Sequence, residues 1–138
     1  MMTKHGTFCW PIRVYYEDTD AGGIVYYANY LKFLERARTE WLRSLGIEQD
    51  TWLAQQVAFV VRHVDLDLQA PARFNDELSV TVVVTKLGRA SVVFQQQVLD
   101  KHGKLLCQAQ VKAACVDNKA MRAVAMPAEI LGELRRGS

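Results

Sequence analysis

The sequence has 138 residues, of which 50% are hydrophobic and 23% are charged, and its formal net charge is +2. This composition excludes a mainly disordered chain, and the charge balance excludes a strongly basic protein that binds nucleic acid. The length suits one domain, so we expect a single domain over residues 1–138.

The first elements that the sequence predicts are a strand, a turn and a long helix. Residues 12–18 are rich in β-branched and aromatic side chains and predict the strand, and the turn formers of residues 18–23 follow. Apolar side chains then recur at helical spacing over residues 29–45. Asn29 is the expected N-cap of this amphipathic helix, and Gly46 fits the position just after its end.

The rest of the chain predicts antiparallel strands and a short terminal helix. The strands are expected over residues 57–69, 78–85, 91–99 and 105–116, and the helix, opened by Pro127, over residues 128–135. The order of strand, helix and then a run of strands indicates an α+β protein rather than a parallel sheet. We expect the sheet to curl around the long helix, because this buries the wide apolar face of the helix.

The cysteines and histidines predict neither a disulfide framework nor a metal site. The three cysteines are widely spaced without a Cys-x-x-Cys pair, and the three histidines are scattered. The N-terminus lacks the apolar segment of a signal peptide, and no run approaches the roughly 18–20 apolar residues of a membrane span. We therefore expect a cytoplasmic protein without a metal and without a membrane span.

A cluster of carboxylates stands just before the long helix. Glu17, Asp18 and Asp20 are followed by Gly22 and Gly23. A helix N-terminus presents free backbone N–H groups, which can stabilise an oxyanion that develops on a carbonyl. A nearby carboxylate can act as a nucleophile or as a general base. The alternative interpretation is a solvated acidic turn.

Residues 14–38, VYYEDTDAGGIVYYANYLKFLERAR, resemble the signature of the hotdog-fold acyl-CoA thioesterases of the 4-hydroxybenzoyl-CoA thioesterase-like family. Within that family, the chain is most similar to the Tol-Pal-associated (YbgC-like) acyl-CoA thioesterases. Residues 58–62, 70–73 and 86–91 add to a likeness that covers nearly the whole chain. The resemblance implies a hotdog fold, in which a five-stranded antiparallel sheet wraps around one long central helix.

The resemblance also implies roles for individual residues. Asp20 corresponds to the catalytic carboxylate of the family, and the backbone N–H of Tyr27 corresponds to its oxyanion donor. Gly23 belongs to the same loop and keeps the path to the carbonyl open. Many YbgC-like proteins carry His in place of Tyr27, whereas the benzoyl-CoA branch carries Tyr, and either residue supplies the backbone donor. Asp18 and Glu17 remain competitors for the catalytic role.

Three basic residues are candidates for binding the phosphates of CoA. Arg89 lies in a turn between two predicted strands, and Lys86 and Arg62 are further candidates. The alternative is that these residues are ordinary solvated charges. The implied reaction hydrolyses an acyl-CoA to a carboxylic acid and CoA, and it needs no cofactor beyond the CoA of the substrate.

The resemblance implies a homo-oligomer, a dimer of dimers, with the site between subunits. Val83, Val93 and Ala114 are expected on the outer face of the sheet, where an apolar surface favours association. Acyl carrier protein is a possible alternative carrier of the acyl group.

Two rival functions stay open. A hydratase or dehydratase would need a His at the start of the helix, and residues 6–62 contain no His. A non-catalytic module that binds acyl-CoA or acyl carrier protein, linked to envelope or phospholipid metabolism, is the second rival.

Overall fold

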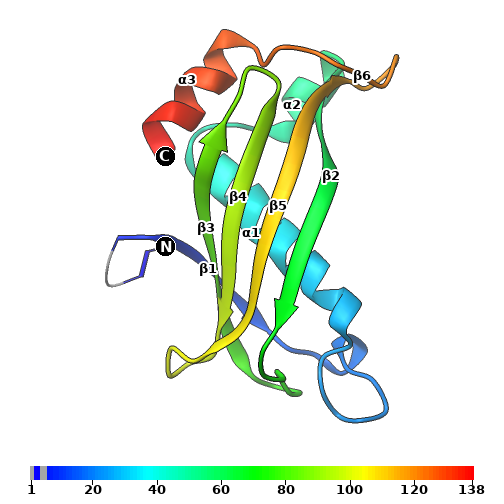
Figure 1. Ribbon diagram of the computed structural model, residues 1–138, viewed down its shortest axis with the longest axis vertical. Coiled ribbons are helices and arrows are strands. Elements are labelled where there is room, and N and C mark those ends of the chain that lie inside the picture. Colours follow the sequence, from blue (N-terminus) through cyan, green and yellow to red (C-terminus); the bar gives the residue numbers. More distant parts are fainter. Residues whose placement is uncertain (1, 4–5) are drawn as a thin grey trace.

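A curled antiparallel sheet wraps around one long helix in this computed structural model, which describes residues 2–3 and 6–138 (Figure 1). The helix is α1 (Tyr30–Ser44). The order of the main strands across the sheet is β1 (Phe8–Arg13), β3 (Glu77–Leu87), β4 (Ser91–Leu99), β5 (Leu105–Asp117) and β2 (Val57–Leu68). A two-residue strand, β6 (Arg122–Ala123), pairs with the end of β5. The predicted α+β hotdog architecture is confirmed.

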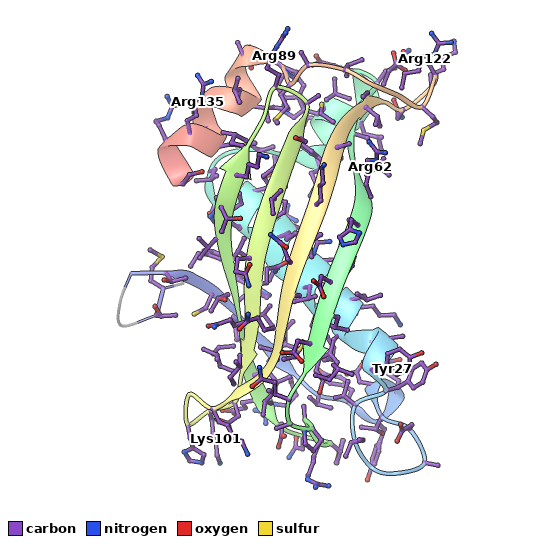
Figure 2. All side chains as sticks on the ribbon, viewed as in Figure 1. Tyr27, Arg62, Arg89, Lys101, Arg122 and Arg135 are labelled. Atoms are coloured by element: carbon purple, nitrogen blue, oxygen red, sulfur yellow. The ribbon has the colours of Figure 1, made fainter. Side chains whose placement is uncertain are left out.

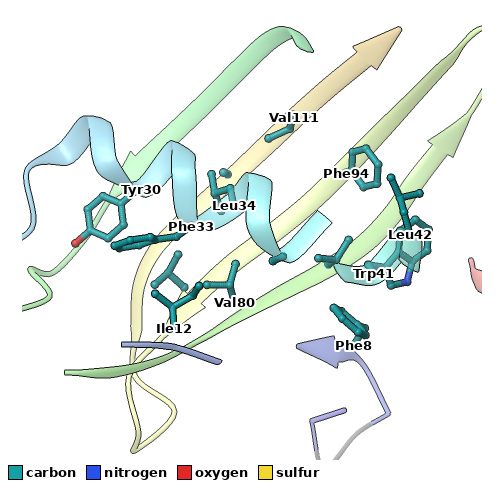
Figure 3. Close-up of a cluster of buried hydrophobic side chains, with 14 of the residues drawn as sticks. Phe8, Ile12, Tyr30, Phe33, Leu34, Trp41, Leu42, Val80, Phe94 and Val111 are labelled. Atoms are coloured by element: carbon teal, nitrogen blue, oxygen red, sulfur yellow. The ribbon is translucent and has the colours of Figure 1, made fainter. Parts of the chain in front are cut away.

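Helix α1 connects the two edges of the sheet. Strands β1 and β2 are those edges, and α1 lies between them in the sequence. The helix therefore crosses the concave face of the sheet (Figure 1). Its buried side chains are Tyr30, Phe33, Leu34, Ala37, Trp41 and Leu42. They belong to one core together with inward-facing side chains of four strands, including Ile12, Val80, Phe94 and Val111 (Figure 3).

The C-terminal end of α1 is the one that the sequence predicts. Gly46 has a φ of +83° and follows the C-cap residue. Its N–H donates to the carbonyl of Arg43 at 3.0 Å, and the N–H of Ile47 donates to the carbonyl of Leu42 at 2.9 Å. These two hydrogen bonds form a Schellman motif, in which a glycine is favoured because the backbone is left-handed.

The N-terminal end of α1 lies where the sequence predicts it, but the capping contact differs. A 3₁₀ turn, η2 (Tyr27–Asn29), precedes the helix, and Asn29 has a helical backbone conformation. The Asn29 side chain does not cap the helix, because its Nδ2 donates to the carbonyl oxygen of Asp18 at 2.9 Å. Asn29 therefore stands at the predicted N-cap position, but its side chain ties the helix to the preceding loop instead of capping it.

The first predicted strand is also misplaced. Strand β1 ends at Arg13, where its pairing with β3 ends at Glu77, and residues 16–18 form a 3₁₀ turn, η1 (Tyr16–Asp18). The Asp18 carboxylate accepts the N–H of Tyr15 at 2.8 Å, and such local bonds compete with extended structure.

Two helices complete the chain. The short helix α2 (Gln49–Ala54) has no counterpart in the prediction, whereas α3 (Ala128–Gly137) agrees with the predicted terminal helix. No helix in the part of the chain that the structure describes is long and apolar enough to cross a membrane.

The side chains expected on the outer face of the sheet differ in exposure. Val83 is 42% exposed, whereas Ala114 is only 4% exposed within the single chain. Ala114 is a small residue that lies between Val60 of β2 and Ser91 of β4 in the sheet. Its expected contribution to an exposed apolar face is therefore wrong, and Val93 is only half-buried.

Candidate active site

The turn after β1 holds Asp20 in a defined position. The N–H of Asp20 donates to the carbonyl of Ile24 at 2.9 Å, and the N–H of Gly23 donates to the carbonyl of Asp20 at 3.0 Å. The Asp20 Oδ1 accepts the N–H of Gly22 at 2.8 Å. A Cβ at Gly22 would lie 3.2 Å from that oxygen, and Gly23 has a φ of +79°, so both positions suit glycine.

Asp20 and Tyr27 line the same open pocket, which has a volume of about 340 Å³. Tyr30 and residues 68–71, at the end of β2 and just after it, also line this pocket. Tyr27 is the first residue of η2, so its backbone N–H has no acceptor within that turn. The structure thus brings together Asp20 and Tyr27, the two residues to which the resemblance assigns roles. We call this hollow the Asp20 pocket.

The two competing carboxylates lie in other environments. Asp18 is only 6% exposed, and its Oδ2 accepts the N–H of Tyr15, so this carboxylate holds the turn together. Glu17 is exposed and lines a different hollow, next to the stacked rings of Tyr16 and Phe74. Of the three carboxylates, Asp20 is the one placed beside the start of η2 in the Asp20 pocket.

The basic candidates lie at the other end of the molecule. Figure 2 shows Tyr27 at one end, and Arg62 and Arg89 toward the opposite end. Arg62 occupies a bulge in β2, and Lys86 lies near the turn that holds Arg89. All three side chains are exposed, and within residues 2–3 and 6–138 none of them forms an ion pair. A single chain does not bring them to Asp20.

The Thioesterase-like superfamily matches residues 14–134. The chain belongs to this superfamily. It is 45% identical over 129 residues to the acyl-CoA thioester hydrolase YbgC of Escherichia coli O6:H1, covering 94% of this chain and 96% of that protein. It is 48% identical over 124 residues to the acyl-CoA thioesterase YbgC of Haemophilus influenzae, covering 89% of this chain and 90% of that protein.

A solved structure of a probable thioesterase from Bartonella henselae matches with a TM-score of 0.78 and 31% identity. The match covers 88% of this chain and 98% of that chain. These similarities confirm the resemblance to the YbgC-like thioesterases. They also show that the chain is an enzyme of the thioester hydrolase class.

The sequence did not predict a second cavity, of about 110 Å³, between α1 and the sheet. Its wall includes Phe59 and Val61 of β2 together with Arg38 of α1. The Nη1 of Arg38 donates to the Oε1 of the fully buried Gln96 at 3.0 Å, and burial lowers the pKa of the guanidinium. The sequence did contain a signal for this position of Arg38. Arg38 follows the buried Leu34 by four residues, and residues with this spacing lie on the same face of a helix.

The structure offers no cluster of metal ligands in the part that it describes. Among residues 2–3 and 6–138, no three side chains of His, Cys, Asp or Glu are grouped so that they could hold an ion. The three cysteines are buried and free, and burial raises the pKa of the Cys107 thiol to about 12. A thiol held in this state is a poor nucleophile.

Proposed function

We propose that the protein is an acyl-CoA thioesterase, which hydrolyses the thioester bond of an acyl-CoA to a carboxylic acid and CoA. The observation that carries this proposal is that Asp20 and Tyr27 line the same pocket. The names of the relatives support the same activity. In the part of the chain that the structure describes, no histidine lines this pocket, which disfavours a hydratase.

Asp20 can act by either of two routes in this pocket. In the first, a carboxylate oxygen bonds to the acyl carbon, the C–S bond breaks with its electrons on the CoA sulfur, and water then cleaves the mixed anhydride. In the second, Asp20 removes a proton from a water molecule whose oxygen bonds to the acyl carbon, and the C–S bond then breaks with its electrons on the CoA sulfur. The hydrogen bond from Gly22 occupies Oδ1, and within residues 2–3 and 6–138 nothing occupies Oδ2.

The carbonyl oxygen of the thioester gains negative charge in both routes. The N–H of Tyr27, the first residue of η2, is the donor that we assign to this oxygen. A thiolate is a good leaving group, so the reaction does not need a general acid to protonate the sulfur. We propose that neither a metal nor a cofactor takes part, apart from the CoA of the substrate.

Initial rates against short, long and aromatic acyl-CoAs test this proposal. Hydrolysis of at least one class well above the uncatalysed rate is expected. Binding of acyl-CoA or acyl carrier protein without hydrolysis would favour the non-catalytic binding module instead. The same panel defines the preferred acyl group, and a matching panel of acyl carrier protein thioesters compares the two carriers.

A second subunit would bring the separated residues together. Strand β2 is an edge of the sheet and has 12 residues, and long unpaired edges are normally covered. Two copies of β2 that pair about a two-fold axis run antiparallel, so the beginning of one lies beside the end of the other. Arg62 lies in the first half of β2, whereas residues 68–71 of the Asp20 pocket begin at its last residue.

We therefore propose that the active site lies between subunits. Arg62, Lys86 and Arg89 of one subunit would then face the CoA phosphates of a substrate held at Asp20 of the other. The 110 Å³ cavity opens beside Phe59 and Val61, in the same half of β2, and is the proposed receiver of the acyl group. The exposed outer face of the sheet, which includes Val83, is the proposed contact for a dimer of dimers.

Dilution is expected to remove activity and association together. Light scattering coupled to size exclusion should show a dimer or a tetramer, and specific activity should fall as the complex dissociates. The reason is that the proposed site takes residues from two chains. A stable monomer with full activity would contradict both the assembly and the shared site.

Chelators are expected to leave the rate unchanged. The proposed mechanism uses a carboxylate and a backbone N–H, and neither requires a divalent ion. The measurement is the initial rate before and after EDTA treatment and dialysis. A loss of rate that a divalent ion restores would contradict the metal-free mechanism.

We place the enzyme in the cytoplasm, where thiols stay reduced, because its three cysteines are free and buried. A link to the Tol-Pal system and the use of acyl carrier protein as an alternative carrier follow from the resemblance to the YbgC-like branch. We propose both the Tol-Pal link and the use of acyl carrier protein. A pull-down with purified acyl carrier protein, loaded and unloaded, tests the second.

A further inference from the structure

Tyr30, a residue in the wall of the Asp20 pocket, carries a buried hydroxyl group. The residue is only 3% exposed and lines this pocket together with Asp20 and Tyr27. Its ring packs edge-on against the ring of Phe33, with centroids 5.9 Å apart and an interplanar angle of 89°. Figure 3 shows the Tyr30 oxygen on the side of the ring that faces away from Phe33 and the core. The hydroxyl therefore has a fixed position.

The hydrogen-bonding capacity of this hydroxyl is only half used. The Tyr30 oxygen accepts the N–H of Ala72 at 3.2 Å. A tyrosine hydroxyl can also donate one hydrogen bond, and among residues 2–3 and 6–138 no group accepts its hydrogen. Buried donors are normally paired, because an unpaired one loses its bond to water without replacement. The hydrogen is free to point toward a molecule bound in the pocket.

We infer that the Tyr30 hydroxyl is a catalytic hydrogen-bond donor to the carbonyl oxygen of the bound thioester, acting together with the backbone N–H of Tyr27. This inference rests on the proposed thioesterase function and adds a side-chain donor to it. Two donors that converge on one oxygen are the usual construction of an oxyanion hole. Burial raises the pKa of Tyr30, so the hydroxyl keeps its hydrogen at the pH at which thioesters are assayed.

The first test replaces Tyr30 with phenylalanine. Removal of one oxyanion donor lowers kcat by about 10²–10³-fold, and KM should change much less, because the bond strengthens in the transition state. Tyr15→Phe is the matched control, since Tyr15 is 60% exposed and lies outside the Asp20 pocket. Circular dichroism at the assay temperature confirms that both variants are folded. A Tyr30→Phe variant with the kcat of the wild type would overturn the inference.

The second test separates catalysis from a structural role, because Tyr30→Phe also removes the acceptor for Ala72. Incorporation of 3,5-difluorotyrosine at position 30 retains the oxygen but lowers the pKa of the phenol. The phenolate cannot donate, so kcat should fall at high pH in this variant and not in the wild type. A pH profile identical to that of the wild type would overturn the inference. A wild-type enzyme that hydrolyses none of the acyl-CoAs would instead overturn the proposed function, and the inference with it.

Discussion

Replacement of Asp20 with asparagine is expected to lower kcat for thioester hydrolysis by about 10²–10⁴-fold and to leave the fold intact. An amide can neither attack the acyl carbon nor take a proton from water, so either catalytic route is lost. The fold should survive, because Asp20 is exposed and an amide oxygen can still accept the N–H of Gly22. Steady-state rates and circular dichroism provide the measurements.

Asp18→Asn is the matched control for this prediction. The Asp18 carboxylate is buried and accepts a backbone N–H, and an amide oxygen accepts such a bond more weakly than a carboxylate does. The expected result is a lower Tm, with most of the kcat retained while the protein is folded. If Asp18→Asn were inactive but stable, and Asp20→Asn were active, the catalytic assignment would be wrong.

Replacement of Phe33 with alanine is expected to reduce the free energy of unfolding by about 3–5 kcal/mol. Phe33 is fully buried between α1 and the sheet, so its removal loses apolar contacts and leaves a cavity (Figure 3). Domains of this size are stable by only about 5–15 kcal/mol, so much of the stability is lost. Urea denaturation followed by fluorescence or circular dichroism measures the change.

Leu31→Ala is the control on the same helix. Leu31 is 42% exposed and is separated from Phe33 by a single residue. Its replacement should change the free energy of unfolding by about 0.5 kcal/mol or less. Similar losses in the two variants would contradict the prediction, because burial against the sheet would then not explain the loss at Phe33. Alanine is the best helix former, so helix propensity cannot account for a loss at either position.

Most of the fold could be predicted because the long elements carry strong periodic patterns. Helix α1 buries one face, and the side chains of β4 alternate between buried and half-buried along the strand. The errors lie where local polar contacts decide the structure. Residues 16–18 turn because the carboxylate of Asp18 binds the N–H of Tyr15, which the β-branched and aromatic composition could not reveal.

The candidate site could be predicted only in part. The carboxylates before the helix predict a site at the helix start, the resemblance implies roles for Asp20 and Tyr27, and the two residues do share a pocket. The role of Asp18 in holding the turn depends on its burial, which three adjacent carboxylates do not reveal. The Tyr30 hydroxyl accepts a hydrogen bond from the N–H of Ala72, which lies 42 residues further along the chain. No local sequence pattern signals so distant a contact.

The connection of both sheet edges by α1 has a consequence for folding kinetics. Phe8 of β1 pairs with Val82, and Val57 of β2 pairs with Asp117, so both edges close through contacts distant in the sequence. High contact order of this kind slows folding, because long loops must close before the pairing stabilises them. Asp20 follows β1 and the turn η1, so we expect it to take its place in the Asp20 pocket only after these long-range pairings form. A nascent chain that lacks β3 cannot pair β1, so Asp20, the proposed catalytic carboxylate, is not yet held in its turn.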